Sequence, residues 1–356
     1  MATIKEAATL IAAIGAEVTP LLLGEPGIGK SSILPILEAR FGDAYEYIYV
    51  DCPNLDLPEY GMPQVVKGVT STAPNAMWRF DSQKPKIIML DELTKAQPHM
   101  KPVLTTTMLE RRVGTNKFPG GSIVFGTGNL TTDGVGDSMQ GHIGNRVARV
   151  HVEKSSADIW LSWALNNDIS ATICAAVAQM PHSLASYVNT DGSLNTSQQD
   201  NLYIYNPKRP SQSTSAAFVS PRSLHKASHV LAQREVLGTA LLTEVLEGVV
   251  GIAFARDLMA YDALTAHLPK WEDILAHPDK ALVPTSTAAQ WLLVFSSVPK
   301  VDATTAAALT TYFLRFDIEV RMTWARQFKD MGPRLVALLR IAAFKDMLIG
   351  EHWLFS

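Results

Sequence analysis

The chain has 356 residues, of which 47% are hydrophobic and 18% are charged. It can therefore build a large core, which excludes intrinsic disorder as its general state, and its length suits two or three domains. The 31 Lys and Arg residues against 34 Asp and Glu residues leave a formal net charge of -3, unlike the strongly basic domains that bind nucleic-acid phosphates.

Cysteine content and hydropathy indicate the cellular compartment of the protein. Two cysteines, Cys52 and Cys174, lie far apart in the sequence, which excludes a disulfide framework. The first residues lack a secretory pattern. The most apolar long segment, 241–260, carries four charged residues, whereas a membrane span needs about 20 nearly uncharged ones. We therefore expect a cytoplasmic protein without a membrane span.

Residues 1–153 are predicted to form an α/β domain. Apolar residues recur at helical spacing from Ile4 to Ile14, and a second helix is expected at 32–40. Short apolar runs predict five strands, at 19–24, 46–51, 86–91, 122–129 and 146–153. Strands with few polar residues, separated by helical segments, predict a parallel sheet with helices flanking both faces.

Residues 154–356 are predicted to form an all-helical domain with a helical extension at its C-terminal end. Helical patterns cover 158–166 and 171–187, and they resume at Ser220. The polar, turn-rich stretch 188–215 between them predicts a long loop or an insertion.

The strongest motif lies between the first predicted strand and the second predicted helix. It matches the pattern G-x-x-x-x-G-K-[ST] and consists of Gly24, Glu25, Pro26, Gly27, Ile28, Gly29, Lys30 and Ser31, with Ser32 following. Glycines allow the backbone N–H groups to turn inward around phosphates, and the helix N-terminus adds a favourable dipole. The motif predicts that Lys30 contacts the β- and γ-phosphates of a nucleotide and that the Ser31 hydroxyl binds Mg²⁺.

A second motif ends the third predicted strand. Four apolar residues, 87–90, are followed by Asp91 and Glu92, the Walker-B arrangement of P-loop proteins. Asp91 is expected to hold Mg²⁺, and Glu92 to orient and deprotonate the attacking water. The two motifs together predict a Mg²⁺-dependent nucleoside triphosphatase.

Further segments resemble those of AAA+ ATPases. Residues 126–129 end a predicted strand, and Asn129 resembles the sensor-1 residue of that family. Residues 144–149 resemble the segment that carries the arginine finger. The resemblance implies that Arg146 is the first choice for this finger and Arg149 the second, which leaves the choice between them open.

One further segment that resembles AAA+ ATPases lies in the second half of the chain. Residues 220–223, Ser-Pro-Arg-Ser, look like the segment that carries the sensor-2 arginine. Ser220 is a good N-cap and Pro221 a good first-turn residue, so Arg222 is expected in the opening turn of a helix. The resemblance implies that Arg222 contacts the phosphates when the helical lid closes.

The intervening sequence is similar to the MoxR branch of AAA+ proteins. Its pattern DE-x-x-x-A at 91–96 is followed by LE-R-R-V-G at 109–114. Residues 61–68, in a stretch that closes at Trp78, resemble the helix-2 insert of that branch, and residues 112–121 its pre-sensor-1 hairpin. These motifs appear in the order expected for the branch.

The resemblance covers about residues 19–235, and it implies an ATP-driven homo-oligomeric ring, usually a hexamer. Such a ring binds ATP between subunits, receives an arginine finger in trans, and remodels a protein client. By resemblance alone, a partner with a von Willebrand factor A domain is expected. The nature of the client and the role of the last hundred residues stay open.

Two other functions compete with this one. Other AAA+ branches use the same fold as motors or loaders on nucleic acid, which the mildly acidic composition and the lack of basic tracts make a weaker alternative. A scaffold that binds ATP with very slow turnover is the third hypothesis, but it has no need of the second carboxylate of Asp91–Glu92.

Overall fold

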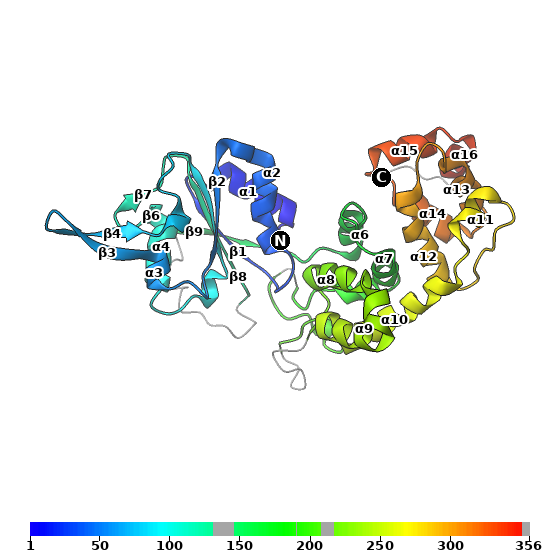
Figure 1. Cartoon of the computed structure of the whole chain (residues 1–356), viewed down its shortest axis with the longest axis horizontal. Coiled ribbons are helices and arrows are strands. Elements are labelled where there is room, and N and C mark those ends of the chain that lie inside the picture. The colour runs from blue at the N-terminus through cyan, green and yellow to red at the C-terminus, as the bar shows by residue number, and fades with distance from the viewer. Residues whose placement is uncertain (131–145, 190, 208–216, 351–356) are drawn as a thin grey trace. The chain divides into compact units, whose positions relative to one another are not determined.

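The structure, a computed structural model, describes residues 1–130, 146–189, 191–207 and 217–350 (Figure 1). It divides into two compact units. Unit 1 comprises the described residues of Met1–Lys154, Ser186–Gln199 and Asn206–Pro210, and unit 2 those of Ser155–Ala185, Asp200–Tyr205 and Ser211–Ser356. The polar stretch 188–215 is thus shared between the units, and its residues 190 and 208–215 lie outside the described part.

Unit 1 is built on a parallel five-stranded sheet with the order β2-β5-β8-β1-β9. The strands are β1 (Thr19–Leu23), β2 (Glu46–Asp51), β5 (Lys86–Asp91), β8 (Ile123–Gly128) and β9 (Val147–His151). All residues of β5 and β8 are buried, as expected for strands covered on both faces. The predicted parallel sheet is confirmed, and β2 and β5 match their predicted bounds to the residue.

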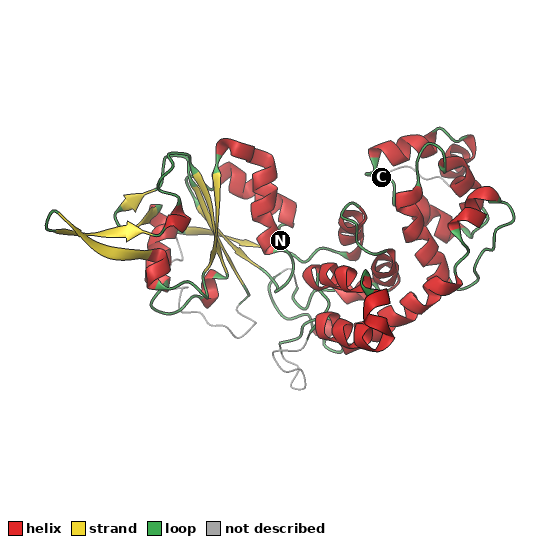
Figure 2. Ribbon diagram, viewed as in Figure 1, coloured by secondary structure: helices red, strands yellow, loops and turns green. Residues whose placement is uncertain are grey.

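Helices cover both faces of this sheet (Figures 1 and 2). They are α1 (Ile4–Ile14), α2 (Ile33–Phe41), α3 (Leu57–Tyr60) and α4 (Lys101–Glu110). Alternate residues of β5 separate two cores: Ile87 and Met89 pack with α1 and α2, whereas Ile88 and Leu90 pack with side chains of α3 and α4. This alternation follows from the two-residue period of a strand.

Two small antiparallel hairpins project from unit 1. The first joins β3 (Gly61–Val66) to β4 (Val69–Pro74), and the second joins β6 (Arg112–Val113) to β7 (Asn116–Lys117). They occupy the segments that resemble the helix-2 insert and the pre-sensor-1 hairpin. Trp78, which follows the first hairpin in the sequence, is fully buried.

Unit 2 is helical, as predicted, and the chain has no strand in its described part beyond His151. Its helices are α6 (Ala157–Leu165), α7 (Ala171–Gln179), α8 (Pro221–Leu231), α9 (Arg234–Val250), α10 (Ile252–Leu264), α11 (Trp271–Ala276), α12 (Thr287–Ser297), α13 (Ala306–Phe313), α14 (Ile318–Arg326), α15 (Gly332–Leu339) and α16 (Ala342–Gly350). The helix predicted to reach residue 187 ends at Gln179, because Pro181 cannot continue the hydrogen-bond ladder. No helix among those described has the length and hydropathy of a membrane span.

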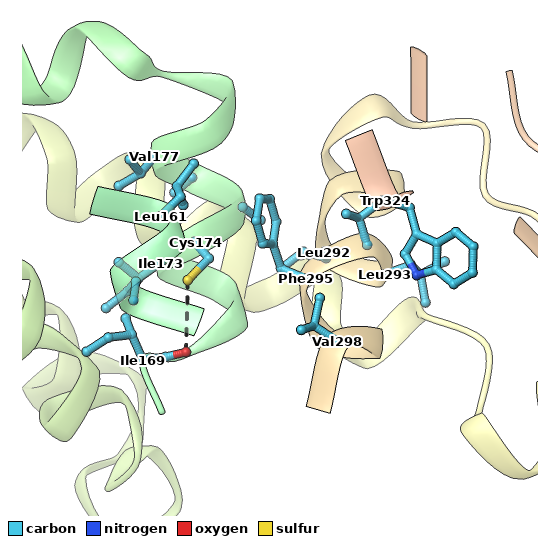
Figure 3. Close-up of a cluster of buried hydrophobic side chains, with 14 of the residues drawn as sticks. Leu161, Ile169, Ile173, Cys174, Val177, Leu292, Leu293, Phe295, Val298 and Trp324 are labelled. Carbon is cyan, nitrogen blue, oxygen red and sulfur yellow. Dashed lines mark hydrogen bonds between the residues drawn. The ribbon is translucent and has the colours of Figure 1, made fainter. Parts of the chain in front are cut away.

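One hydrophobic core runs through unit 2 (Figure 3). Side chains of α6 and α7, among them Leu161 and Ile173, join those of α12 and α14 in it. Trp324 of α14 stacks on Phe313 with ring centroids 4.5 Å apart. The core of this unit therefore forms separately from the two cores that flank the sheet of unit 1.

Candidate functional site

The loop Gly24–Ser31 leaves β1 and enters a 3-10 turn, η1 (Lys30–Ser32), that leads directly into α2. Gly29 has a φ of 102°, a conformation that a residue with a Cβ adopts only under strain. A Cβ on Gly24 would lie 2.7 Å from the carbonyl oxygen of Val152. The loop thus needs glycine at both places, and its turn precedes a helix N-terminus, where anions bind.

Lys30 lies inside this loop, and its side chain is only 7% exposed. Its Nζ donates to the carbonyl oxygens of Gly24 at 2.7 Å and Glu25 at 2.8 Å. It also donates to Oδ1 of Asn129, just beyond β8, at 3.3 Å. The structure therefore brings Asn129 to the loop across 99 residues of sequence.

Asp91 ends β5 beside the same loop and is 6% exposed. Its Oδ2 accepts hydrogen bonds from the hydroxyls of Ser31 at 3.1 Å and Tyr49 at 2.8 Å. Its Oδ1 accepts one from the hydroxyl of Thr127 in β8. Three hydroxyl groups from three segments thus hold one carboxylate, and the structure brings Ser31 and Asp91 together.

Glu92 follows Asp91 in a left-handed conformation, with φ 50° and ψ 36°, which is uncommon for a residue other than glycine. Its N–H donates to Oγ1 of Thr127 at 3.0 Å. Its carboxylate pairs with Nζ of Lys95 at 2.9 Å. Backbone strain and an ion pair therefore fix the direction in which Glu92 leaves the strand.

The chemistry of Ser31 and Asp91 fits a magnesium ion. Hydroxyl and carboxylate oxygens are the hard donors that Mg²⁺ prefers. Among the described residues, no group of three or more His, Cys, Asp or Glu side chains could enclose a metal. A site of two protein oxygens suits Mg²⁺, because this ion usually completes its shell with water and substrate phosphates.

Glu25 is buried at the start of the loop, 4% exposed, and its Oε1 accepts a hydrogen bond from the hydroxyl of Ser186. The negative charge of Glu25 also acts on Lys154. Burial nevertheless lowers the pKa of Lys154 to about 8, because desolvation of the ammonium group outweighs the attraction of Glu25.

The other residues of the predicted motif stabilise the shape of the loop. Ile28 is buried in the core formed with α1 and α2. Ser32 donates from its hydroxyl to the carbonyl oxygen of Gly29 at 2.7 Å, which closes the turn. Pro26 and Gly27 form a turn, with Gly27 at a φ of 76°.

The three candidate arginines are exposed. Arg146 directly precedes β9, which is an edge strand of the sheet, and Arg149 lies within it. Residues 144 and 145 of the same motif lie outside the described part of the chain. Arg222 belongs to unit 2, in the first turn of α8, where Ser220 caps the helix as predicted.

Sequence reasoning missed Thr127 and Tyr49 at Asp91, and Ser186 at Glu25. Thr127 lies within the motif 126–129, and the strand order would have placed it next to Asp91. Tyr49 precedes Asp51 by two residues in β2, and Asp51 is in register with Asp91. The polar sequence around Ser186 contains no signal that identifies its partner.

Comparison with known proteins identifies the segment that carries this site. Residues 20–120 match the family described as AAA domain (dynein-related subfamily). The match covers the loop that holds Lys30 and the pair Asp91–Glu92. Together with the parallel sheet, it indicates that unit 1 has the fold of a P-loop AAA domain. No match to a curated protein is found.

Several solved structures share low similarity with the chain. An Hsp104 structure with ATPγS and FITC casein is 16% identical, covers 43% of this chain and 31% of its own, and has a TM-score of 0.32. NtrX from Brucella abortus with ADP is 12% identical over 96% and 68% of the two chains, with a TM-score of 0.38. A RuvB mutant from Thermotoga maritima is 10% identical over 98% and 86%, with a TM-score of 0.34.

Proposed function

We propose that this chain is a Mg²⁺-dependent ATPase of the AAA+ class. The observation that carries the proposal is the convergence of Lys30, Ser31 and Asp91 at the ends of β1 and β5. The buried ammonium group of Lys30 donates to the carbonyl oxygen of Gly24 in the loop. The hydroxyl of Ser31, in the same loop, donates to the carboxylate of Asp91. The family match over residues 20–120 supports the same assignment.

Lys30 is poised to exchange its partners for phosphate oxygens. Its acceptors include neutral oxygens of Gly24, Glu25 and Asn129, and a charged phosphate oxygen forms a stronger hydrogen bond with an ammonium group than a neutral acceptor does. The N-terminus of α2 adds backbone N–H groups for the same anion. We therefore assign Gly24–Ser32 to nucleotide binding.

Ser31 and Asp91 would hold Mg²⁺, which, when bound, neutralises charge on the phosphates. Glu92 is assigned as the general base that orients and deprotonates water. Asn129, within reach of Lys30, is assigned to orient that water or the γ-phosphate. Oε2 of Glu92 is engaged by Lys95, so this ion pair must open if Oε2 is to accept the proton.

The arginine assignments extend the proposal beyond one chain. Arg146 or Arg149, exposed at the edge strand β9, would reach the nucleotide of a neighbouring copy and stabilise charge on the transferring phosphoryl group. Arg222 would act as the sensor of the helical lid. The assembly would be a homo-oligomer, most simply a hexamer.

The proposed work of this ring is the remodelling of a protein client, as in the MoxR branch, with a von Willebrand factor A domain protein as partner. The segments that resemble that branch coincide with the hairpins β3–β4 and β6–β7. A nucleic-acid motor is the second candidate, and the net charge of -3 makes it the weaker one.

Two substitutions test the ATPase assignment. Lys30→Ala should abolish nucleotide binding, because it removes the buried cation, whereas Glu92→Gln should keep binding and stop turnover. Lys5→Ala and Glu38→Gln, both at exposed positions, are the matched controls. Equal ATPase rates for Glu92→Gln and the wild type would disprove the role of Glu92 as base.

Assembly and client class need a separate measurement. The specific ATPase rate should rise with protein concentration, and particle mass should rise in ATP with Glu92→Gln. Arg146→Ala and Arg149→Ala should lower the rate without preventing nucleotide binding if either is the finger. A concentration-independent rate from a monomer would refute the ring, and stimulation by DNA or RNA with steep salt dependence would favour the nucleic-acid motor.

A further inference from the structure

Tyr49 contacts the candidate metal ligand from a strand that contributes nothing else to the proposed chemistry. It lies in β2, which is an edge strand of the sheet and pairs only with β5. Tyr49 is in register with Met89, and Asp51, two residues further along, is in register with Asp91. The phenol hydroxyl thus reaches forward along the sheet to Oδ2 of Asp91, at 2.8 Å.

The contact is specific to this tyrosine. Tyr49 is 50% exposed as a residue, and its hydroxyl donates to Asp91 in a partly buried contact. Tyr47, on the same strand, directs its hydroxyl to the carbonyl oxygen of Gly42 at 2.8 Å instead. The interaction of Tyr49 with Asp91 is therefore a property of the site and not a general feature of tyrosines in this strand.

The shared oxygen is the important detail. Oδ2 of Asp91 accepts from both Ser31 and Tyr49, while Oδ1 accepts from Thr127. Without Tyr49, one lone pair of Oδ2 would turn to water, and only Ser31, itself a candidate metal ligand, would hold this side of the carboxylate. Hydrogen bonds to ligating carboxylates orient them and tune their affinity for metal.

We propose that Tyr49 is a positioning residue for Mg²⁺ binding, which orients Oδ2 of Asp91 toward Ser31. The inference rests on the proposed function, because it assumes that Ser31 and Asp91 hold the ion. It assigns Tyr49 no contact with nucleotide and no role in the affinity for nucleotide without metal.

The test is the Mg²⁺ dependence of nucleotide binding by the full-length Tyr49→Phe variant. A fluorescent ADP analogue is titrated in EDTA and then at increasing MgCl₂ concentrations. We expect the affinity in EDTA to stay within about twofold of wild type, and the MgCl₂ concentration for half-maximal effect to rise about ten- to hundredfold, the scale on which loss of a hydrogen bond to a ligating carboxylate weakens metal binding. Tyr47→Phe, which removes a hydroxyl from the same strand, should leave both values unchanged.

Each of the other outcomes contradicts this inference, the proposed function, or both. If the wild type responds to MgCl₂ and Tyr49→Phe responds identically, Tyr49 has no positioning role while the ATPase assignment stands. If Tyr49→Phe loses affinity in EDTA, the contact supports the loop and not the metal ligand, which also overturns the inference. If the wild type binds no nucleotide, or binds it without any response to MgCl₂, both the proposed function and this inference fail.

Discussion

The hydroxyl of Ser186 donates a hydrogen bond to Glu25 of the phosphate loop, although 161 positions separate the two residues. Ser186 begins the segment Ser186–Gln199, which belongs to unit 1, whereas the residues on either side of that segment belong to unit 2. The first residue of a returning segment is thus tied to the loop that would bind nucleotide.

The first prediction concerns this contact. Ser186→Ala should increase hydrogen exchange in residues 186–199, because the buried carboxylate of Glu25 loses a donor, at a cost of about 1–3 kcal/mol, and the N–H of Val188 loses its acceptor, Oγ of Ser186. Hydrogen-exchange mass spectrometry measures the effect. Ser193→Ala is the matched control, since Ser193 bonds within the segment, to Asp191. Equal exchange in Ser186→Ala and the wild type would mean that other contacts hold the segment.

The second prediction concerns the core of unit 2. Trp324 is fully buried, stacks on Phe313, and donates from Nε1 to the hydroxyl of Ser297 at 3.0 Å. Trp324→Ala should destabilise this unit by about 3–5 kcal/mol, because it leaves a large cavity. Urea denaturation followed by far-UV circular dichroism tests this. Trp163→Ala, at a residue 43% exposed, should cost less than about 1 kcal/mol, and similar losses for both variants would contradict the packing.

The elements that follow from local sequence were predicted well, and the contacts between elements were not. β2 and β5 were predictable because uninterrupted apolar runs end at Asp51 and Asp91. The loop at Lys30 was predictable because its glycines occur at the spacing that a phosphate-binding turn requires. Thr127 and Tyr49 reach Asp91 because of the register between neighbouring strands. This register cannot be read from a single sequence.

Two other features show the same limit. The segment 186–199 has the composition of a loop, and composition does not reveal that its first residue bonds to Glu25. The hairpin β3–β4 exposes Val65, Val66 and Val69, so its residues lack the alternation of a strand with one buried face. Only the resemblance to the helix-2 insert indicated structure there.

The third prediction concerns pH. Burial lowers the pKa of Lys154 to about 8 in the folded chain, against about 10.4 for an unfolded lysine. Between these values the unfolded state binds more protons, so the free energy of unfolding should rise with pH. Below about pH 8 both states are protonated, and the full cost of the buried charge applies.

The variant Lys154→Met should lack this pH dependence of the free energy of unfolding. Relative to wild type, the variant should gain more stability at pH 7 than at pH 10, and thermal unfolding across this range measures the change. Lys84→Met, at an exposed position, corrects for effects of pH on the chain as a whole. A difference between Lys154→Met and the wild type that stays constant from pH 7 to 10 would contradict the lowered pKa.

The last prediction follows from the ion pair between Glu92 and Lys95, which joins Oε2 and Nζ at 2.9 Å. A partly exposed pair of this kind contributes about 0.2–1 kcal/mol. If Glu92 is the base, this pair engages Oε2 of its carboxylate and must open before that oxygen can accept a proton. Lys95→Met should therefore raise kcat by up to about fivefold, since 1.36 kcal/mol corresponds to about tenfold in rate.

Steady-state ATPase assays at saturating ATP and MgCl₂ measure this effect, with Lys5→Met as the control at an exposed position. Nucleotide affinity should not change, because Lys95 contacts neither Lys30 nor Asp91 in the hydrogen bonds that define the site. A fall in kcat with unchanged affinity would mean that Lys95 holds Glu92 in its working direction. The left-handed turn at Glu92 would then be insufficient by itself to aim the carboxylate.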